Sequence, residues 1–131
     1  MKRVFMAVSV ALMLIPLLVG CNGGDHTNTY EQITPAEAKV LMDSGERYVI
    51  LDVRTPEEYA AGHIAGAILI PDYEIREKAE SILTDKDQLI LVYCRSGRRS
   101  KNAANELATL GYTNVKEFGG INDWKYGTVT D

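Results

Sequence analysis

The chain has 131 residues, with 14 basic and 18 acidic side chains and a formal net charge of −4. That length supplies one domain with a modest core and excludes two. An acidic chain without a basic stripe is poorly suited to nucleic acid or to anionic lipid headgroups, so we expect neither as a partner.

The first 20 residues have the pattern of a secretory signal peptide. Lys2 and Arg3 precede an apolar stretch from Val4 to Val19. This stretch is shorter than the roughly 18 or more apolar residues of a spanning helix, and Pro16 interrupts it. We therefore expect residues 1–20 to be a cleaved signal and not a permanent anchor helix.

The end of this segment, LVGC, resembles the lipobox of bacterial lipoproteins. By that resemblance Cys21 becomes the lipidated N-terminus of the mature protein, and its acyl chains supply the two or more hydrophobic groups that stable anchoring requires. The alternative is an ordinary secretory signal in which Cys21 has no role. The lipobox predicts a protein of the bacterial cell envelope, lipid-anchored to a membrane on the extracytoplasmic side, and leaves open which membrane.

The remainder is expected to be a short tether over residues 21–29 and a folded domain over residues 30–131. The tether is small and polar, NGGDHTNT from residue 22 onward. The signal holds two basic and no acidic residues, so the 111 residues that follow it carry a formal charge of −6. If Cys21 carries lipid, the second cysteine, Cys94, has no disulfide partner in an oxidising compartment. That thiol is then either buried and inert or kept for its reactivity.

Within the domain, helical patterns alternate with short apolar runs. Two helix starts carry the capping-box pattern Thr-Pro-x-Glu, at residues 34–37 and 55–58. Strands are expected at residues 48–53, 67–71, 88–93 and 114–118, and helices at 34–45, 55–62, 73–83, 100–111 and 119–127. This alternation predicts an α/β fold with a mainly parallel sheet of about five strands, flanked by helices on both faces.

The segment CRSGRRS, residues 94–100, places Cys94 where a buried strand ends, which is where such sheets bind ligands. Backbone N–H groups of the loop and a helix start near Ser100 both favour a negative charge there. Four basic residues locally reverse the negative charge of the chain: Arg95, Arg98, Arg99 and Lys101. They indicate an anion site, with a solvated helix face as the alternative. These groups favour thiolate over thiol, which makes Cys94 a candidate nucleophile.

The arginines also bear on the burial of the thiol. Arginines cannot surround a fully buried sulfur without partners for their own charge. We therefore expect Cys94 to be a reactive thiol and not a buried, inert one.

The loop sequence CRSGRR resembles the active loop of the rhodaneses, C-R-x-G-x-R/T. Residues 51–71, LDVRTPEEYAAGHIAGAILIP, are similar to the first signature of that family, and residues 119–124, GGINDW, to its closing one. The resemblance implies a rhodanese-like fold and a sulfurtransferase. Cys94 would take a sulfane sulfur from thiosulfate or a similar anionic donor and hold it as a persulfide. A thiol, cyanide or a protein sulfur acceptor would then remove it.

The resemblance further implies how the loop binds substrate. Backbone amides would stabilise the persulfide anion, and Arg95 and Arg99 would hold the sulfonate oxygens. The expected substrate-binding residues are therefore the whole loop after the cysteine: Arg95, Ser96, Gly97, Arg98 and Arg99.

Three further residues of the signatures are expected to support the site. Asp52 and Arg54 end a central strand and are expected to brace the active loop through a buried ion pair. His63 is expected to be a hydrogen-bonded structural histidine, since an ionised thiol needs no general base. No metal or organic cofactor is expected, because His26 and His63 show no ligand spacing with either cysteine.

Other functions are compatible with parts of this pattern. A phosphatase or arsenate reductase of the cell-cycle phosphatase type needs C-x5-R, but position 100 is serine and Tyr93 stands where that group has histidine. A non-catalytic rhodanese-like binding module is disfavoured by the intact Cys94. A persulfide carrier would use every residue named above, so it stays open beside the enzyme.

Overall fold

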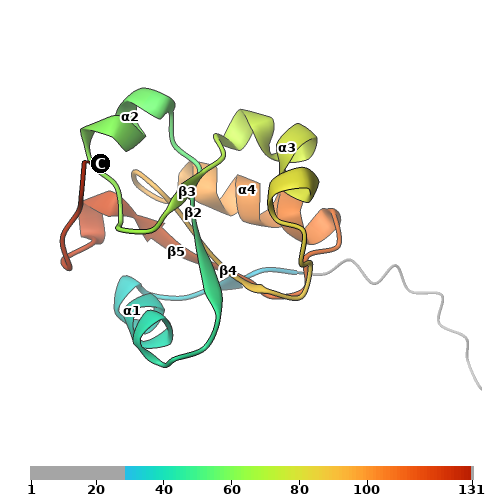
Figure 1. The fold of residues 1–131 in the computed structure, drawn as a ribbon, viewed down its shortest axis with the longest axis horizontal. Coiled ribbons are helices and arrows are strands. Elements are labelled where there is room, and N and C mark those ends of the chain that lie inside the picture. The colour runs from blue at the N-terminus through green and yellow to red at the C-terminus, as the bar shows by residue number, and fades with distance from the viewer. Residues whose placement is uncertain (1–28, 131) are drawn as a thin grey trace, which may run out of the picture.

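The computed structural model describes residues 29–130, which form an α/β domain around one five-stranded sheet (Figure 1). The strand order is β1-β5-β4-β2-β3, and every neighbouring pair is parallel. The strands are β1 (Glu31–Gln32), β2 (Tyr48–Asp52), β3 (Ile68–Leu69), β4 (Leu89–Cys94) and β5 (Val115–Gly120). The helices are α1 (Pro35–Asp43), α2 (Pro56–Ala61), α3 (Ile75–Ile82) and α4 (Arg98–Thr109), with the 3-10 turns η1 (Asp72–Glu74) and η2 (Ile121–Asp123). The predicted fold class is confirmed.

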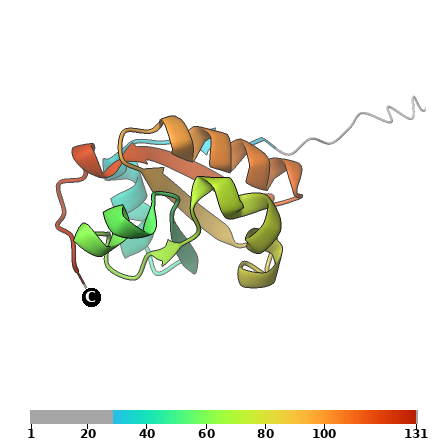
Figure 2. The same ribbon diagram turned by 90° about the horizontal axis from the view of Figure 1, so that it is seen from above.

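Helices cover both faces of the sheet (Figures 1 and 2). On one face α3 and α4 pack against a core that includes Leu51, Val92 and Leu107. On the other face α1 packs against a second core that includes Leu91 and Phe118. Successive residues of a strand point to opposite faces, so β4 supplies side chains to both cores. Because helices cover both faces, β4 is buried along its whole length.

The two predicted capping boxes are present. The Thr34 hydroxyl accepts the backbone N–H of Glu37, whose carboxylate reaches back to the N–H of Thr34. Thr55 and Glu58 make the same exchange at the start of α2. Each exchange satisfies two N–H groups that have no partner within their helix.

The structure departs from the predicted elements in several places. β1 has no counterpart among the expected strands, because its two exposed polar residues acquire strand geometry only by pairing with β5. α4 begins at Arg98, two residues before the expected start, since Gly97 turns the chain with φ 111°. Residues 72–83 divide into η1 and α3, and the closing segment forms only the 3-10 turn η2 after the glycines that end β5.

The amino-terminal predictions lie outside the described residues. These are the signal at residues 1–20, the lipidated Cys21 and all but the last residue of the tether at 21–29. They stay predictions, as do the expected domain boundaries. Within residues 29–130, no helix has both the length and the apolar character that spanning a membrane requires.

Candidate active site

Cys94 is the last residue of β4 and lies at the carboxyl edge of the sheet. The parallel register places Tyr93 beside Asp52 of β2, and Cys94 beside Gly120 of β5. Three residues, 95–97, then connect the cysteine to the first turn of α4 (Figure 1). The thiol therefore lies at the edge where parallel sheets bind ligands, between a strand end and a helix N-terminus.

The sulfur receives a backbone hydrogen bond from its own loop. The N–H of Gly97 donates to Cys94 Sγ over 3.0 Å. The positive φ of Gly97, 111°, is a backbone conformation that side-chain-bearing residues rarely adopt, and it turns the chain tightly enough for this contact. The 12-residue helix α4 begins at the next residue and adds its positive dipole end. Both effects stabilise negative charge on the sulfur.

The expectation that Cys94 is not buried was wrong, because Cys94 is only 1% exposed, while its reactivity stays a prediction. The burial was misjudged because the loop arginines were expected to lie around the sulfur without partners for their charge. Arg95 and Arg98 are exposed, and Arg99 finds a carboxylate partner. No arginine charge therefore has to be buried around the sulfur. In the same loop Ser96 is exposed and Gly97 is buried.

Arg99 pairs with the residue that caps α2. Its two terminal nitrogens donate to the two carboxylate oxygens of Glu58 over 2.7 and 3.0 Å. The hydrogen bond from Arg99 lowers the pKa of Glu58 to about 2. In return, the hydrogen bond with Glu58 raises the pKa of Arg99, and the nearby Cys94 adds to that effect. The guanidinium is thus held by Glu58 and interacts electrostatically with Cys94, while its contact with a donor anion stays a prediction.

Two residues near the sulfur were missed as site residues in the sequence. Cys94 Sγ donates to Ser100 Oγ over 3.3 Å, and Ser100 Oγ lies 2.6 Å from Glu117 Oε1. Ser100 is fully buried and Glu117 is 2% exposed. The available signal was Glu117 inside the short strand pattern NVKEF. A glutamate in a buried strand needs a polar partner, because glutamate is almost never buried without one.

The buried ion pair expected from Asp52 and Arg54 is present. Arg54 Nη2 lies 2.7 Å from Asp52 Oδ2 and also donates to the carbonyl oxygen of Gly62 over 2.7 Å. The Tyr93 hydroxyl donates to Asp52 Oδ2 over 2.6 Å and accepts the N–H of Ile64 over 3.1 Å. The pair thus reaches the cysteine loop through Tyr93, the residue before Cys94, and its bracing role stays a prediction.

Burial and the contacts with Asp52 shift the pKa values of Tyr93 and Arg54. Burial raises the pKa of Tyr93 above its ordinary range, and the hydrogen bond to Asp52 raises it further. Burial disfavours the charge on Arg54, yet its hydrogen bond and charge interaction with Asp52 prevail and raise its pKa. The phenol therefore stays protonated and the guanidinium stays charged.

His63 is buried where the end of α2 meets the last described residues. Its Nδ1 lies 2.8 Å from the carbonyl oxygen of Tyr59, and its ring stacks on that of Tyr59 with centroids 3.7 Å apart. Its backbone exchanges two hydrogen bonds with Val129. These contacts agree with a structural histidine.

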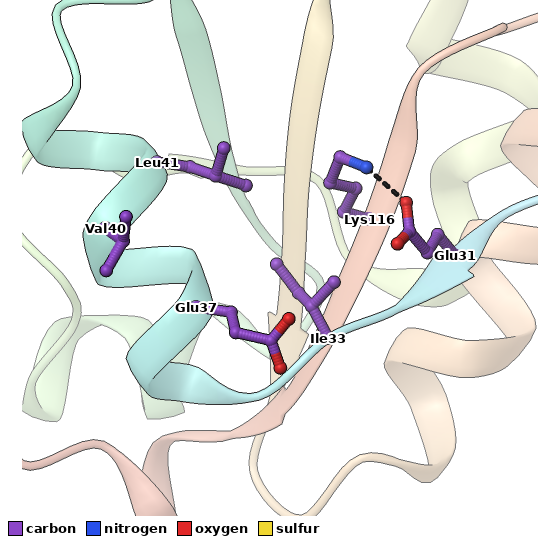
Figure 3. Close-up of a pocket in the computed structure, with 6 residues that line it drawn as sticks. All are labelled: Glu31, Ile33, Glu37, Val40, Leu41 and Lys116. Carbon is purple, nitrogen blue, oxygen red and sulfur yellow. Dashed lines mark hydrogen bonds and ion pairs between the residues drawn. The ribbon is translucent and has the colours of Figure 1, made fainter.

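A surface hollow of about 320 Å³ lies elsewhere, between α1 and the β1 edge of the sheet (Figure 3). Six residues line it: Glu31, Ile33, Glu37, Val40, Leu41 and Lys116. The Lys116 ammonium pairs with the Glu31 carboxylate at its rim (Figure 3). None of the six belongs to the cysteine loop. Among residues 29–130, no cluster of three or more His, Cys, Asp or Glu side chains could hold a metal ion.

Comparison with known proteins identifies the family. Residues 34–126 match the rhodanese-like domain. Thiosulfate sulfurtransferase PspE of Escherichia coli (strain K12) is 42% identical over 73 residues, which cover 56% of this chain and 70% of that protein. The putative sulfur carrier protein YrkF of Bacillus subtilis (strain 168) is 36% identical over 107 residues, which cover 78% of this chain and 57% of that longer protein.

A solved structure shows the same fold. The crystal structure of a rhodanese-related protein from Thermoplasma volcanium superposes with a TM-score of 0.68 at 35% identity, covering 78% of this chain and 100% of the other. The family match and the structural similarity agree, and the chain belongs to the rhodanese-like domain family.

Proposed function

We propose that this protein is a sulfurtransferase that carries a sulfane sulfur on Cys94. The observation that carries the proposal is the setting of Cys94 Sγ at the end of β4, where it accepts the Gly97 N–H and interacts with the charge of Arg99. A sulfur stabilised as an anion next to a fixed cation suits attack on a small anionic donor such as thiosulfate. Relatives named thiosulfate sulfurtransferase support the same reaction class.

The reaction has two balanced steps. First, the Cys94 thiolate attacks the outer sulfur of thiosulfate, the Sγ–S bond forms, and the S–S bond to the sulfonate breaks. Sulfite leaves with that electron pair, and the negative charge of the enzyme moves to the outer sulfur of the persulfide. Second, an acceptor nucleophile attacks the outer sulfur, and the electron pair of the breaking bond restores the thiolate. With cyanide the product is thiocyanate.

Arg95 and Arg99 are the residues expected to hold the donor. The exposed guanidinium of Arg95 is available to an incoming anion, and the Arg99 guanidinium is held in place by Glu58. Their charges attract the dianionic donor and stabilise the departing sulfite. No step in this sequence requires a metal or an organic cofactor.

The phosphatase alternative is less compatible with the loop. Position 100, where C-x5-R needs its arginine, holds a serine whose hydroxyl is buried and bonded to Glu117. Position 100 therefore supplies no guanidinium that could bind a phosphate. The carrier alternative is favoured by one relative, named a putative sulfur carrier protein. A carrier and an enzyme differ in turnover, because a carrier discharges one sulfur to a specific protein and turns over slowly with small acceptors.

The purified protein tests these functions against one another. It is incubated separately with thiosulfate, 3-mercaptopyruvate and a phosphate ester, and intact mass and released product are recorded, with Cys94→Ser as the matched control. A sulfurtransferase gains one sulfur from a sulfur donor and releases no phosphate. Phosphate release that depends on Cys94 would replace the proposal with a phosphatase. Loading without turnover on cyanide or small thiols would favour the carrier.

We also propose that Cys21 anchors the protein to a membrane, on the strength of the LVGC sequence that precedes it. Cells labelled with a fatty acid should incorporate label into the wild-type chain but not into Cys21→Ser, which should also leave the membrane fraction or accumulate uncleaved. Equal labelling of both chains would contradict the anchor. Sulfur transfer does not depend on this outcome.

A further inference from the structure

The Ser100 hydroxyl forms a bridge between the reactive sulfur and a buried carboxylate. It lies 3.3 Å from Cys94 Sγ and 2.6 Å from Glu117 Oε1. It also lies 3.0 Å from the carbonyl oxygen of Gly97. Glu117 Oε1 accepts a second hydrogen bond, from the N–H of Gly119 over 2.8 Å. The bridge connects the start of α4 to β5, and the sulfur-transfer steps above make no use of it.

The single proton of the Ser100 hydroxyl determines the polarity of this bridge. Bonds to a charged carboxylate are shorter and roughly twice as strong as neutral ones, so the 2.6 Å contact is the one that takes the proton. The serine oxygen then presents a lone pair to Cys94 Sγ. A thiol can donate its S–H to that lone pair, whereas a thiolate faces it without a hydrogen.

Glu117 is placed to transmit this constraint. Both of its polar contacts use Oε1 as an acceptor, and within residues 29–130 no salt bridge to it is found. The short hydrogen bond to Glu117 Oε1 holds the Ser100 proton and keeps the hydroxyl from turning toward the sulfur. The charge of Glu117 also repels a negative charge on Sγ, and burial makes that repulsion stronger than in water.

We propose that Glu117 is a positioning residue that acts through Ser100 to disfavour negative charge on Cys94 Sγ, and so favours the persulfide over the free thiolate. In the persulfide Sγ is a neutral, disulfide-like atom, and the charge resides on the outer sulfur. The proposal rests on the proposed sulfur transfer. The bridge shifts the loading equilibrium toward the persulfide, compared with a chain in which the amide of Gly97 alone acts on the sulfur.

Other charged groups act on the sulfur from the opposite direction. The charge of Arg99 on α4 interacts with Cys94, which contributes to the raised pKa of Arg99. Glu58 on α2 pairs with Arg99, and Asp72 of η1 also interacts with it. The three groups oppose one another in part, so the effect of Glu117 is measurable only by changing that residue while they stay in place.

The first test measures thiolate formation directly. The ultraviolet absorbance of the thiolate is followed against pH, and the titration of Cys94→Ser is subtracted so that tyrosines and Cys21 cancel. Glu117→Gln preserves the shape and can still accept from Ser100, but it has no charge. We expect the thiolate of Glu117→Gln to form at a pH lower by about one unit or more. An unchanged or higher midpoint of the thiolate titration would overturn the proposal.

The matched control removes the same charge from an outer position. Glu106 on α4 pairs with the exposed Arg76, and among residues 29–130 it makes no hydrogen bond or ion pair with the cysteine loop. Glu106→Gln should therefore leave the titration midpoint unchanged. A shift as large as that of Glu117→Gln would show a general charge effect and contradict the bridge. Thermal unfolding of each variant confirms that it is folded.

Ser100→Ala provides a second variant in case Glu117→Gln fails to fold. Loss of the hydroxyl removes both the acceptor of the thiol and the lone pair that faces the thiolate, so the midpoint should fall. A rise would mean that the hydroxyl normally turns toward the thiolate, and would overturn the proposed polarity, as would no change. In the Ser100→Ala background, Glu117→Gln should shift the midpoint by less than half of its effect alone. A full shift there would show that Glu117 does not act through Ser100.

The loaded state gives the final readout. At a pH above both midpoints, each variant is equilibrated with fixed ratios of thiosulfate and sulfite, and the persulfide fraction is measured by intact mass. Glu117→Gln should need a thiosulfate to sulfite ratio higher by roughly threefold or more for half loading. An equal ratio would overturn the proposal. A wild type that never loads sulfur would instead defeat the proposed function, while the thiolate titration would still decide whether Glu117 acts on Cys94.

Discussion

The carboxylate of Glu58 and the guanidinium of Arg99 form a two-point ion pair across 41 positions of the chain. The same carboxylate accepts hydrogen bonds from the backbone N–H and the hydroxyl of Thr55, so it also completes the cap of α2. The pair therefore connects the start of α2 with the first turn of α4, beside the cysteine loop. It holds the Arg99 guanidinium in one place before any donor arrives.

This pair should make stability depend on acidic pH. Its hydrogen bond from Arg99 gives Glu58 a folded-state pKa of about 2, below the ordinary value of 4.5. A lowered pKa means that the stabilisation is complete above about pH 4.5 and is lost as the pH falls toward 2. Glu58→Gln should therefore be less stable by roughly 1 kcal/mol at neutral pH. Urea unfolding at several pH values should show that difference shrinking below pH 4.5; a constant difference would contradict the assignment.

Arg99 should matter for donor binding as well as for stability. Loss of one charge-assisted contact with the donor costs about 1.5–3 kcal/mol, so Arg99→Ala should lower kcat/KM for thiosulfate by roughly tenfold to a hundredfold. Glu58→Gln keeps the guanidinium and should stay within a few-fold of wild type, as should the surface control Arg76→Ala. Higher salt should lower wild-type turnover too. Unchanged kinetics in Arg99→Ala would contradict a role in donor binding and leave Arg99 only its structural ion pair with Glu58.

Gly120 should tolerate no side chain, although its own backbone is extended. A Cβ at Gly120 would lie 2.0 Å from the carbonyl oxygen of Arg95, so the cysteine loop would have to move. Gly120→Ala should therefore abolish most sulfur transfer and destabilise the fold. Gly66→Ala is the matched control, since Gly66 has φ 83° and open space around it and should lose only about 1–2 kcal/mol from backbone strain. Equal activity in the two variants, assayed with thiosulfate and cyanide, would contradict this role of Gly120.

Tyr93 should contribute to stability through its hydroxyl. Tyr93→Phe keeps the ring but removes the hydroxyl. The Asp52 carboxylate then loses one hydrogen-bond donor, and the N–H of Ile64 loses its acceptor. Each unsatisfied buried group costs about 1–3 kcal/mol, so we expect a loss of roughly 2–4 kcal/mol in the free energy of unfolding. The measurement is urea unfolding near neutral pH. A loss below about 0.5 kcal/mol, the range of ordinary surface changes, would mean that water replaces the hydroxyl.

The features that the sequence predicted are local in the chain. A capping box such as Thr55 with Glu58 spans four residues, and its hydrogen bonds form within the first turn of the helix. Apolar runs predicted β2 and β4, because strands of a parallel sheet that is covered on both faces are nearly continuous runs of apolar residues. Once β4 was placed, Cys94 had to lie at the carboxyl edge of the sheet.

The features that the sequence did not predict depend on contacts between distant segments. β1 consists of two exposed polar residues, and its strand geometry comes only from β5. Ser100 and Glu117 meet because α4 packs on β5, and no short-range pattern relates them. The burial of Cys94 was misjudged for the same reason, since the partner of Arg99 lies on a different helix.

The central claim is that Cys94 carries the transferred sulfur, and one cycle of loading and discharge tests it directly. After incubation with thiosulfate and removal of excess donor, the intact protein should be one sulfur atom heavier, with the added mass on the peptide that contains Cys94. Cyanide should return the protein to its original mass and release one equivalent of thiocyanate. Cys94→Ser should show neither change. Thiocyanate formation retained by Cys94→Ser, or a wild type that gains no sulfur, would contradict the account.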